Sequence, residues 1–154
     1  SEGGNQYLPA LRREPERFEP HSRERLLAGA MIPSAWYLQA QRFRRHARQA
    51  MKSLFSQADV LIAPATPCSA TPIGAEEMVI NGQPLPVRAS MGMLTQPISF
   101  LGLPVVTVPL RTASGKPIGL QLIAAPFNEQ ACLRAARALE AMGITDARVA
   151  ESAA

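Results

Sequence analysis

The strongest constraint on the fold of this chain is a set of three short apolar runs, each as long as one β-strand. They span Asp59–Pro64, Val105–Leu110 and Ile118–Ala124. Continuous apolar runs of this length are typical of strands that are buried on both faces of an α/β sheet. Such a sheet needs helices on both sides, and the chain supplies few of them. We therefore predict an α/β piece that has lost the rest of its sheet.

Two helices are predicted between Ser22 and Phe55, and they meet at Pro33. Proline cannot donate the hydrogen bond of a helix interior, so Pro33 or Ser34 should open the second helix. Ser22 is the expected N-cap of the first helix. The second helix carries an apolar stripe, because the following residues share one face: Trp36, Ala40, Phe43, Ala47, Ala50, Met51 and Leu54.

Turn signals divide the second half of the chain. Asn81-Gly82 predicts a tight hairpin over Met78–Val87, which its prolines place at a sheet edge or outside the main sheet. Ser114-Gly115 joins the last two apolar runs, which should therefore pair antiparallel. A final helix is expected after Asn128, closed by Gly143. Its inner side should hold Cys132, Ala135, Ala136, Leu139 and Met142.

The two ends of the chain are polar. Three prolines and five charged residues lie within residues 1–21, which predicts an extended surface segment. Residues 146–154 are small and polar, and we expect a frayed tail.

Composition excludes several classes of protein. The chain is 47% hydrophobic and 18% charged, which does not fit intrinsic disorder. No apolar run approaches the roughly 18 residues of a membrane-spanning helix. The net charge of +4 permits an acidic partner without requiring one. Cys68 and Cys132 are far apart, and they are expected to be reduced, packed thiols of a cytoplasmic protein.

Motifs for metals and nucleotides are missing from the sequence. His21 and His46 are isolated from other ligand residues, and no glycine-rich phosphate loop is present. We therefore predict neither a metal nor a cofactor. The basic run Arg42–Lys52 has few interleaved aromatic residues, so a solvated helix face is favoured over a nucleic-acid site.

Three segments together resemble the C-terminal third of the amidase signature family. They are Pro64–Pro67 after a strand, Leu94–Pro104 before a strand, and Pro117–Glu129 from a strand into a helix. In that family the region reads as a strand ending in Pro-Thr-x-Pro, a Thr-x-Pro-x-Asn-x-x-Gly-x-Pro segment, and a Pro-x-Gly-Leu-Gln strand before the last helix. The resemblance covers Leu27 to Gly143 and is closest for the branch of carboxybiuret hydrolase and the glutamyl-tRNA amidotransferase A subunit.

The resemblance implies an amide-bond hydrolase with a mixed sheet flanked by helices, of which residues 22–145 form the C-terminal part. Such enzymes use a serine nucleophile, a second serine and a lysine, and a glycine- and serine-rich loop stabilises the oxyanion. That loop is absent here. Lys52 and Lys116 are the only lysines, and neither has serine partners in a matching motif. The chain is therefore expected to supply scaffold and one wall of the pocket, and no catalytic residue.

Four residues are candidates for substrate binding. Arg25 matches the position at which the amidotransferase grips a substrate carboxylate, although an exposed helix arginine is the simpler interpretation. Thr95 and Gln96 lie in the segment that approaches the pocket in relatives, but Thr95 could instead cap the next helix. Tyr37 matches a family tyrosine near the pocket, but it could equally belong to the helix stripe. The resemblance also places Gly92 where the amidotransferase has an aspartate that binds an amino group, which argues against an amino-acid amide as the substrate.

Two further kinds of function stay open. The chain could be a stand-alone binding module that uses the basic helix over residues 35–55, or an oligomerisation module with Trp36, Phe43 and Met51 at its interface. For an amidase, the implied partners are a small amide or carboxylated urea-like substrate, the remaining N-terminal part, and a small adaptor similar to the amidotransferase C subunit. A homo-oligomer is also compatible with this interpretation, whereas nucleic acid and membrane are not expected.

Overall fold

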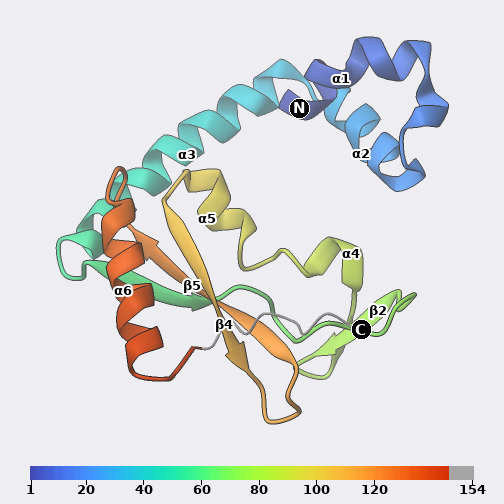
Figure 1. Ribbon diagram of the computed structural model, residues 1–154. Coiled ribbons are helices and arrows are strands. Elements are labelled where there is room, and N and C mark those ends of the chain that lie inside the picture. Colours follow the sequence, from blue (N-terminus) through green and yellow to red (C-terminus); the bar gives the residue numbers. More distant parts are fainter. Residues whose placement is uncertain (146–154) are drawn as a thin grey trace. The chain divides into compact units, whose positions relative to one another are not determined.

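The computed structural model describes residues 1–145 and divides into two compact units (Figure 1). The first unit comprises Ser1–Ala47, and the second begins at Arg48. The 22-residue helix α3 (Ser34–Phe55) belongs to both, so each unit contains one part of it. The tail expected at residues 146–154 lies outside the described residues. No helix within residues 1–145 is long and apolar enough to cross a membrane.

Helices make up the first unit. They are α1 (Glu2–Arg13), the 3₁₀ helix η1 (Pro15–Arg17), α2 (Pro20–Ala30) and the N-terminal part of α3. The extended segment predicted for residues 1–21 is therefore wrong, and α1 even contains Pro9. The physical reason is packing, because Gly4 lets α1 approach α2 so closely that a Cβ there would overlap the backbone of Ala30.

The start of α2 also differs from the prediction. Glu19, not Ser22, is the N-cap, and its carboxylate accepts hydrogen bonds from the backbone N–H groups of His21 at 3.2 Å and Ser22 at 2.8 Å. Pro20 occupies the first turn, where no backbone donor is needed. The predicted break at Pro33 is confirmed, since α3 begins at Ser34.

A three-stranded sheet forms the centre of the second unit. Its strands β1 (Val60–Pro64), β4 (Val105–Arg111) and β5 (Pro117–Ala124) lie in the order β1-β5-β4. Both pairings are antiparallel, which confirms the predicted pairing of β4 with β5. The α/β class is confirmed, although the described strands form no parallel pair of the kind a mixed sheet contains.

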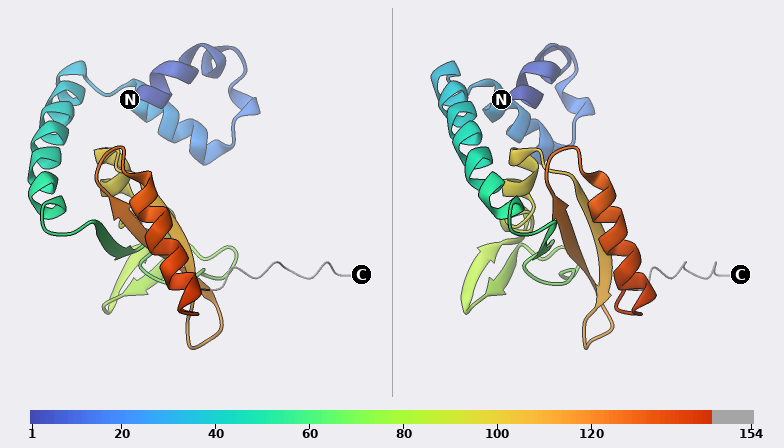
Figure 2. Two further views of the ribbon diagram at one scale, coloured as in Figure 1. Left: turned by 60° about the vertical axis from the view of Figure 1, so that its left-hand side comes forward. Right: turned by 90° about the vertical axis from the view of Figure 1, so that its left-hand side faces the viewer.

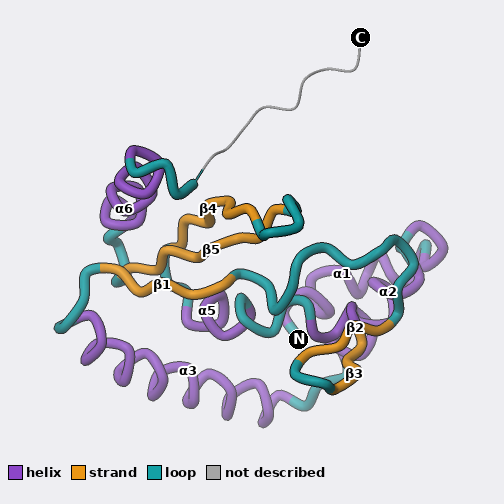
Figure 3. Tube along the Cα trace, turned by 90° about the horizontal axis from the view of Figure 1, so that it is seen from below, coloured by secondary structure: helices purple, strands orange, loops and turns teal. Residues whose placement is uncertain are grey.

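Helices lie on both sides of this sheet. Figure 3 shows α6 (Glu129–Ala141) on one side of the strands and α5 (Gln96–Leu101) on the other. The core under α6 consists of Ala124, Ala131 and Cys132, against which Val60 and Val106 pack. Cys132 is fully buried and Cys68 is half-buried, and both are free thiols as predicted.

The predicted hairpin is confirmed as a separate two-stranded sheet, β2 (Glu77–Ile80) and β3 (Gln83–Pro86). Asn81 and Gly82 both have positive φ angles, 51° and 78°, as this tight turn requires. The hairpin is followed by the short helix α4 (Val87–Ser90). Figure 2 shows the hairpin beside the three-stranded sheet.

Several apolar side chains that were expected to be covered are exposed. On α3, Trp36 is 68% exposed and Leu54 is 45% exposed, so the predicted stripe is not buried within residues 1–145. Ile62 of β1 is 61% exposed, so this strand is not buried on both faces. Met142 is exposed because α6 ends at Ala141, which corrects its predicted place on the inner side of the helix.

The contact between α1 and α2 generates a matched pair of substitutions. Gly4→Ala forces the two helix backbones apart and should lower the free energy of unfolding by about 1–3 kcal/mol. Gly3→Ala meets only the flexible end of the Leu26 side chain, at 3.3 Å, and should raise it by up to about 1 kcal/mol through helix propensity. Urea unfolding checks both, and equal effects of the two alanines would contradict the close approach at Gly4.

Candidate functional site

The three segments that carry the family resemblance meet at one buried amide in the second unit. Gln121 of β5 is only 2% exposed. Its Nε2 donates hydrogen bonds to the carbonyl oxygen of Pro64 at 2.9 Å and to that of Leu94 at 3.3 Å. Pro64 ends β1, and Leu94 lies just before α5. A single side chain thus holds the ends of two segments against a third.

Gly119, two residues earlier on β5, brings the same segments into close contact. Its carbonyl oxygen accepts a hydrogen bond from the backbone N–H of Ala65 at 2.8 Å. A Cβ on Gly119 would lie 2.8 Å from Cγ2 of Thr107 and 2.9 Å from Cβ of Ala65. The Pro-x-Gly-Leu-Gln motif therefore needs glycine for contact and glutamine for the hydrogen bonds.

Thr95 and Gln96 lie at the edge of this junction. The Thr95 hydroxyl donates to the carbonyl oxygen of Gly92 at 3.1 Å and does not cap α5, although Thr95 occupies the N-cap position. Gln96 is exposed, and its amide lies over Gly92, where a Cβ would be 3.2 Å from Nε2 of Gln96. Of these two predicted residues, Gln96 therefore presents its side chain at the surface.

Arg25 and Tyr37 belong to the first unit. Arg25 is exposed on α2, and no hydrogen bond or ion pair joins it to another residue within 1–145. The Tyr37 hydroxyl donates to Oε1 of Glu2 at 2.7 Å, and this hydrogen bond raises the pKa of Tyr37. A cavity of about 400 Å³ lies beside Tyr37, and Arg25 does not line it.

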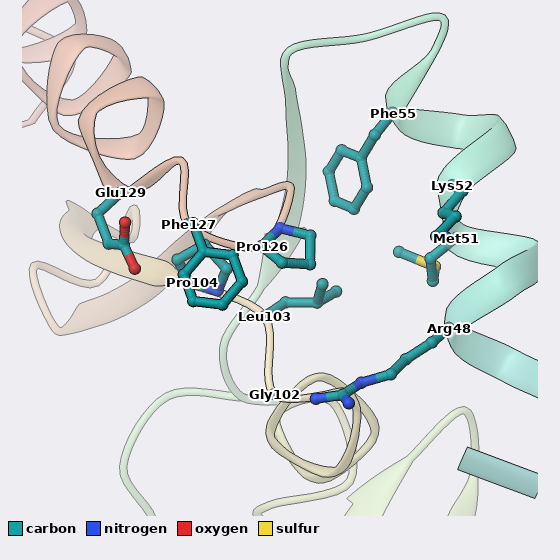
Figure 4. A pocket seen from close by; sticks show the side chains of 10 residues that line it. All are labelled: Arg48, Met51, Lys52, Phe55, Gly102, Leu103, Pro104, Pro126, Phe127 and Glu129. Atoms are coloured by element: carbon teal, nitrogen blue, oxygen red, sulfur yellow. The ribbon is translucent and has the colours of Figure 1, made fainter. Parts of the chain in front are cut away.

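The second unit contains a larger cavity of about 570 Å³, shown in Figure 4. Its lining is mainly apolar and consists of Arg48, Met51, Lys52, Phe55, Gly102, Leu103, Pro104, Pro126, Phe127 and Glu129. Lys52 lies here, but no lining residue is a serine, threonine or cysteine, so the cavity has no nucleophile that this lysine could activate. Residues 1–145 also contain no group of three His, Cys, Asp or Glu side chains that could hold a metal ion.

Sequence reasoning missed the role of Gln121 and the cavity. The signal for Gln121 was available, because it is the one strongly polar residue within the apolar run Ile118–Ala124. Buried polar side chains of this kind are hydrogen-bonded. The cavity gave no comparable signal, because its residues come from separated parts of the chain.

Comparison with known proteins shows that the chain belongs to the amidase family, whose sequence model matches residues 4–133. It is 53% identical over 146 residues to the 1-carboxybiuret hydrolase subunit of Pseudomonas sp. strain ADP, covering 94% of this chain and 32% of that protein. The glutamyl-tRNA(Gln) amidotransferase of Roseiflexus sp. strain RS-1 contains a second relative, its A chain. That chain is 37% identical, and the match covers 85% of this chain and 27% of the relative.

Solved structures agree with this placement. A structure of an s-triazine catabolic enzyme, described as a vestigial protein complex, matches with a TM-score of 0.90 and 51% identity. The match covers 97% of this chain and 33% of that one. A crystal structure of an amidase matches with a TM-score of 0.84 and 32% identity, covering 90% and 32%. The chain thus spans about a third of the length of these relatives.

Replacement of Gln121 should weaken the junction of the three segments. Gln121→Met keeps the approximate shape but removes both hydrogen bonds, and leaving buried carbonyl groups unpaired costs about 1–3 kcal/mol. Urea unfolding should show this loss, and limited proteolysis should cut the Gly92–Pro97 segment faster. Gln130→Met, at an exposed position of α6, is the control and should change stability by less than about 0.5 kcal/mol. Identical behaviour of the two variants would contradict the role given to Gln121.

Proposed function

We propose that this chain is the C-terminal third of a serine amidase that acts on a small amide or a carboxylated urea-like substrate in the cytoplasm. Its part is to supply scaffold and one wall of the substrate pocket, whereas the nucleophile, the second serine and the lysine lie in the N-terminal part. The observation that carries the proposal is the meeting of three family motifs at Gln121, in a chain that spans about a third of its relatives.

The proposal gives the four predicted residues distinct parts. Arg25 is exposed and unpaired among the described residues, so its planar guanidinium is open to a carboxylate. Gln96 presents its amide over Gly92, at the position where the amidotransferase pattern has an aspartate. An amide in place of a carboxylate is poorly suited to bind an ammonium group. This supports a substrate that lacks the amino group of an amino-acid amide.

Thr95 and Tyr37 support the wall more than the substrate. The Thr95 hydroxyl is engaged by Gly92, and the Tyr37 hydroxyl is engaged by Glu2. We therefore propose that they shape the segments from which Gln96 and Arg25 project. A small adaptor protein and a homo-oligomer remain the further partners of this proposal.

The alternative is a binding or oligomerisation module built on the basic helix. The exposed Trp36 and the absence of Asp and Glu from Ser34–Phe55 favour it. The reading frame upstream of this sequence distinguishes the two. A glycine- and serine-rich loop encoded there supports the amidase, whereas a frame that begins near Ser1 supports the module.

The amidase proposal predicts that this chain has no hydrolytic activity by itself. The purified chain should release no ammonia above background from a panel of small amides and ureas, because it lacks the nucleophile and its base. The complete amidase is the positive control. Turnover by the chain that disappears when one of its own serines is replaced by alanine would contradict the proposal.

Arg25 is expected to recognise the carboxylate of the substrate. In the complete amidase, Arg25→Ala should lower kcat/KM for a carboxylated substrate by roughly ten- to a hundredfold, since a hydrogen bond to a charged group contributes about 1.5–3 kcal/mol. A neutral amide of similar size should be little affected. Arg25→Lys should restore only part of the activity, because an ammonium group cannot form the same pair of hydrogen bonds.

Arg45→Ala, at an exposed position of α3, is the matched control and should leave both substrates unaffected. An equal loss on the carboxylated and the neutral substrate, or a parallel fall in Tm, would show that Arg25 is structural.

A further inference from the structure

Phe127 adopts a backbone conformation that its side chain opposes. The backbone N–H of Asn128 donates to the carbonyl oxygen of Ala125 at 3.1 Å, which closes a four-residue turn. Pro126 is second in this turn, and Phe127 is third with a φ of 63°. A positive φ at the third position is normally supplied by Gly or Asn, and in a bulky residue it is an outlier.

The ring of Phe127 gains almost no burial in return for this strain. Its side chain is 97% exposed, although a glycine would form the same turn without strain. Strained residues of this kind are concentrated at functional sites, where another contact compensates for them. Within residues 1–145 that contact is missing, so it has to come from another polypeptide segment.

The surroundings of Phe127 indicate what such a segment carries. Phe127 lines the cavity of about 570 Å³, which we call the Phe127 pocket (Figure 4). Figure 4 shows Met51 and Phe55 of α3 on one side and Leu103 and Pro126 on the other. This lining suits an apolar side chain.

The charges at the pocket favour an acidic neighbour for that apolar side chain. Arg48 and Lys52 stand against the single carboxylate of Glu129. The Arg48 Nε already donates to the carbonyl oxygen of Leu101 at 2.6 Å. Lys52 is exposed and has no hydrogen bond or ion pair among the described residues. It is therefore the cation that is open to a carboxylate.

We propose that the Phe127 pocket binds an apolar side chain flanked by a carboxylate, carried by a segment of the N-terminal two thirds of the amidase. This inference rests on the proposed function. All pocket residues lie within residues 4–133, which match the family, and the relatives are about three times as long as this chain. A second copy fits less well, because a symmetric contact places like patches together and would bring the cations of α3 toward each other.

The test measures binding between two separately produced polypeptides. One is this chain, and the other is the N-terminal two thirds of the 1-carboxybiuret hydrolase subunit of Pseudomonas sp. strain ADP, a relative 53% identical over the shared region. Phe127→Gly and Phe127→Asn suit the turn and should keep or raise Tm, yet weaken binding by roughly tenfold or more, as expected for a central aromatic anchor. Lys52→Glu should weaken binding several-fold, and less so at high salt. Ile73→Ser, which removes a fully exposed apolar side chain outside the pocket, is the control and should leave binding unchanged.

Each remaining outcome contradicts a distinct statement. Unchanged binding by Phe127→Gly overturns the inference and leaves the proposed function intact. Failure of the unaltered chain to bind overturns the proposed function, and the inference with it. A dimer of this chain, detected by light scattering and lost only in the Phe127 variants, would assign the pocket to a second copy and overturn the inference.

Discussion

The buried side chain of Gln121 is the interaction on which the arrangement of the second unit depends. Its two hydrogen bonds connect β5 to the end of β1 and to the segment before α5, which are separated by 57 and 27 positions in the sequence. Hydrogen bonds in a buried environment are costly to leave unmade, so the amide fixes both segments at once. Gly119 makes this possible because a side chain there would hold Ala65 and Thr107 away from the strand. The path of the segment that carries Thr95 and Gln96 is therefore a consequence of β5.

Local signals in the sequence were sufficient where the responsible physics is local. Pro33 separates two helices because proline ends the pattern of backbone donors, and Asn81-Gly82 turns a hairpin because both residues tolerate positive φ. The prediction failed at α1, where prolines and charged residues suggested an extended segment. The contact that stabilises this helix, Gly4 against α2, joins residues that are distant in the sequence. No local pattern contains that information.

The candidate site shows the same division more sharply. The resemblance to the amidase family selected the segments that meet at Gln121, so the position of the site was accessible from sequence. The state of each side chain was not. Thr95 is bonded to Gly92, Tyr37 is bonded to Glu2, and only Gln96 and Arg25 present open polar groups among these four predicted residues. Hydrogen-bond partners of this kind follow from the backbone path, which motifs specify only in outline.

Exposed apolar side chains connect the fold to the proposed function. A hydrophobic fraction of 47% is normal for a protein that folds as a complete globule, yet Trp36 is 68%, Ile62 is 61% and Phe127 is 97% exposed. Single exposed apolar residues are common on soluble proteins and need no explanation. Phe127 differs from the others because it combines exposure with a strained turn and an apolar cavity beside it. Strain in the backbone costs free energy whether or not the ring is covered, so only a contact outside the described residues gives a phenylalanine an advantage over glycine at this position.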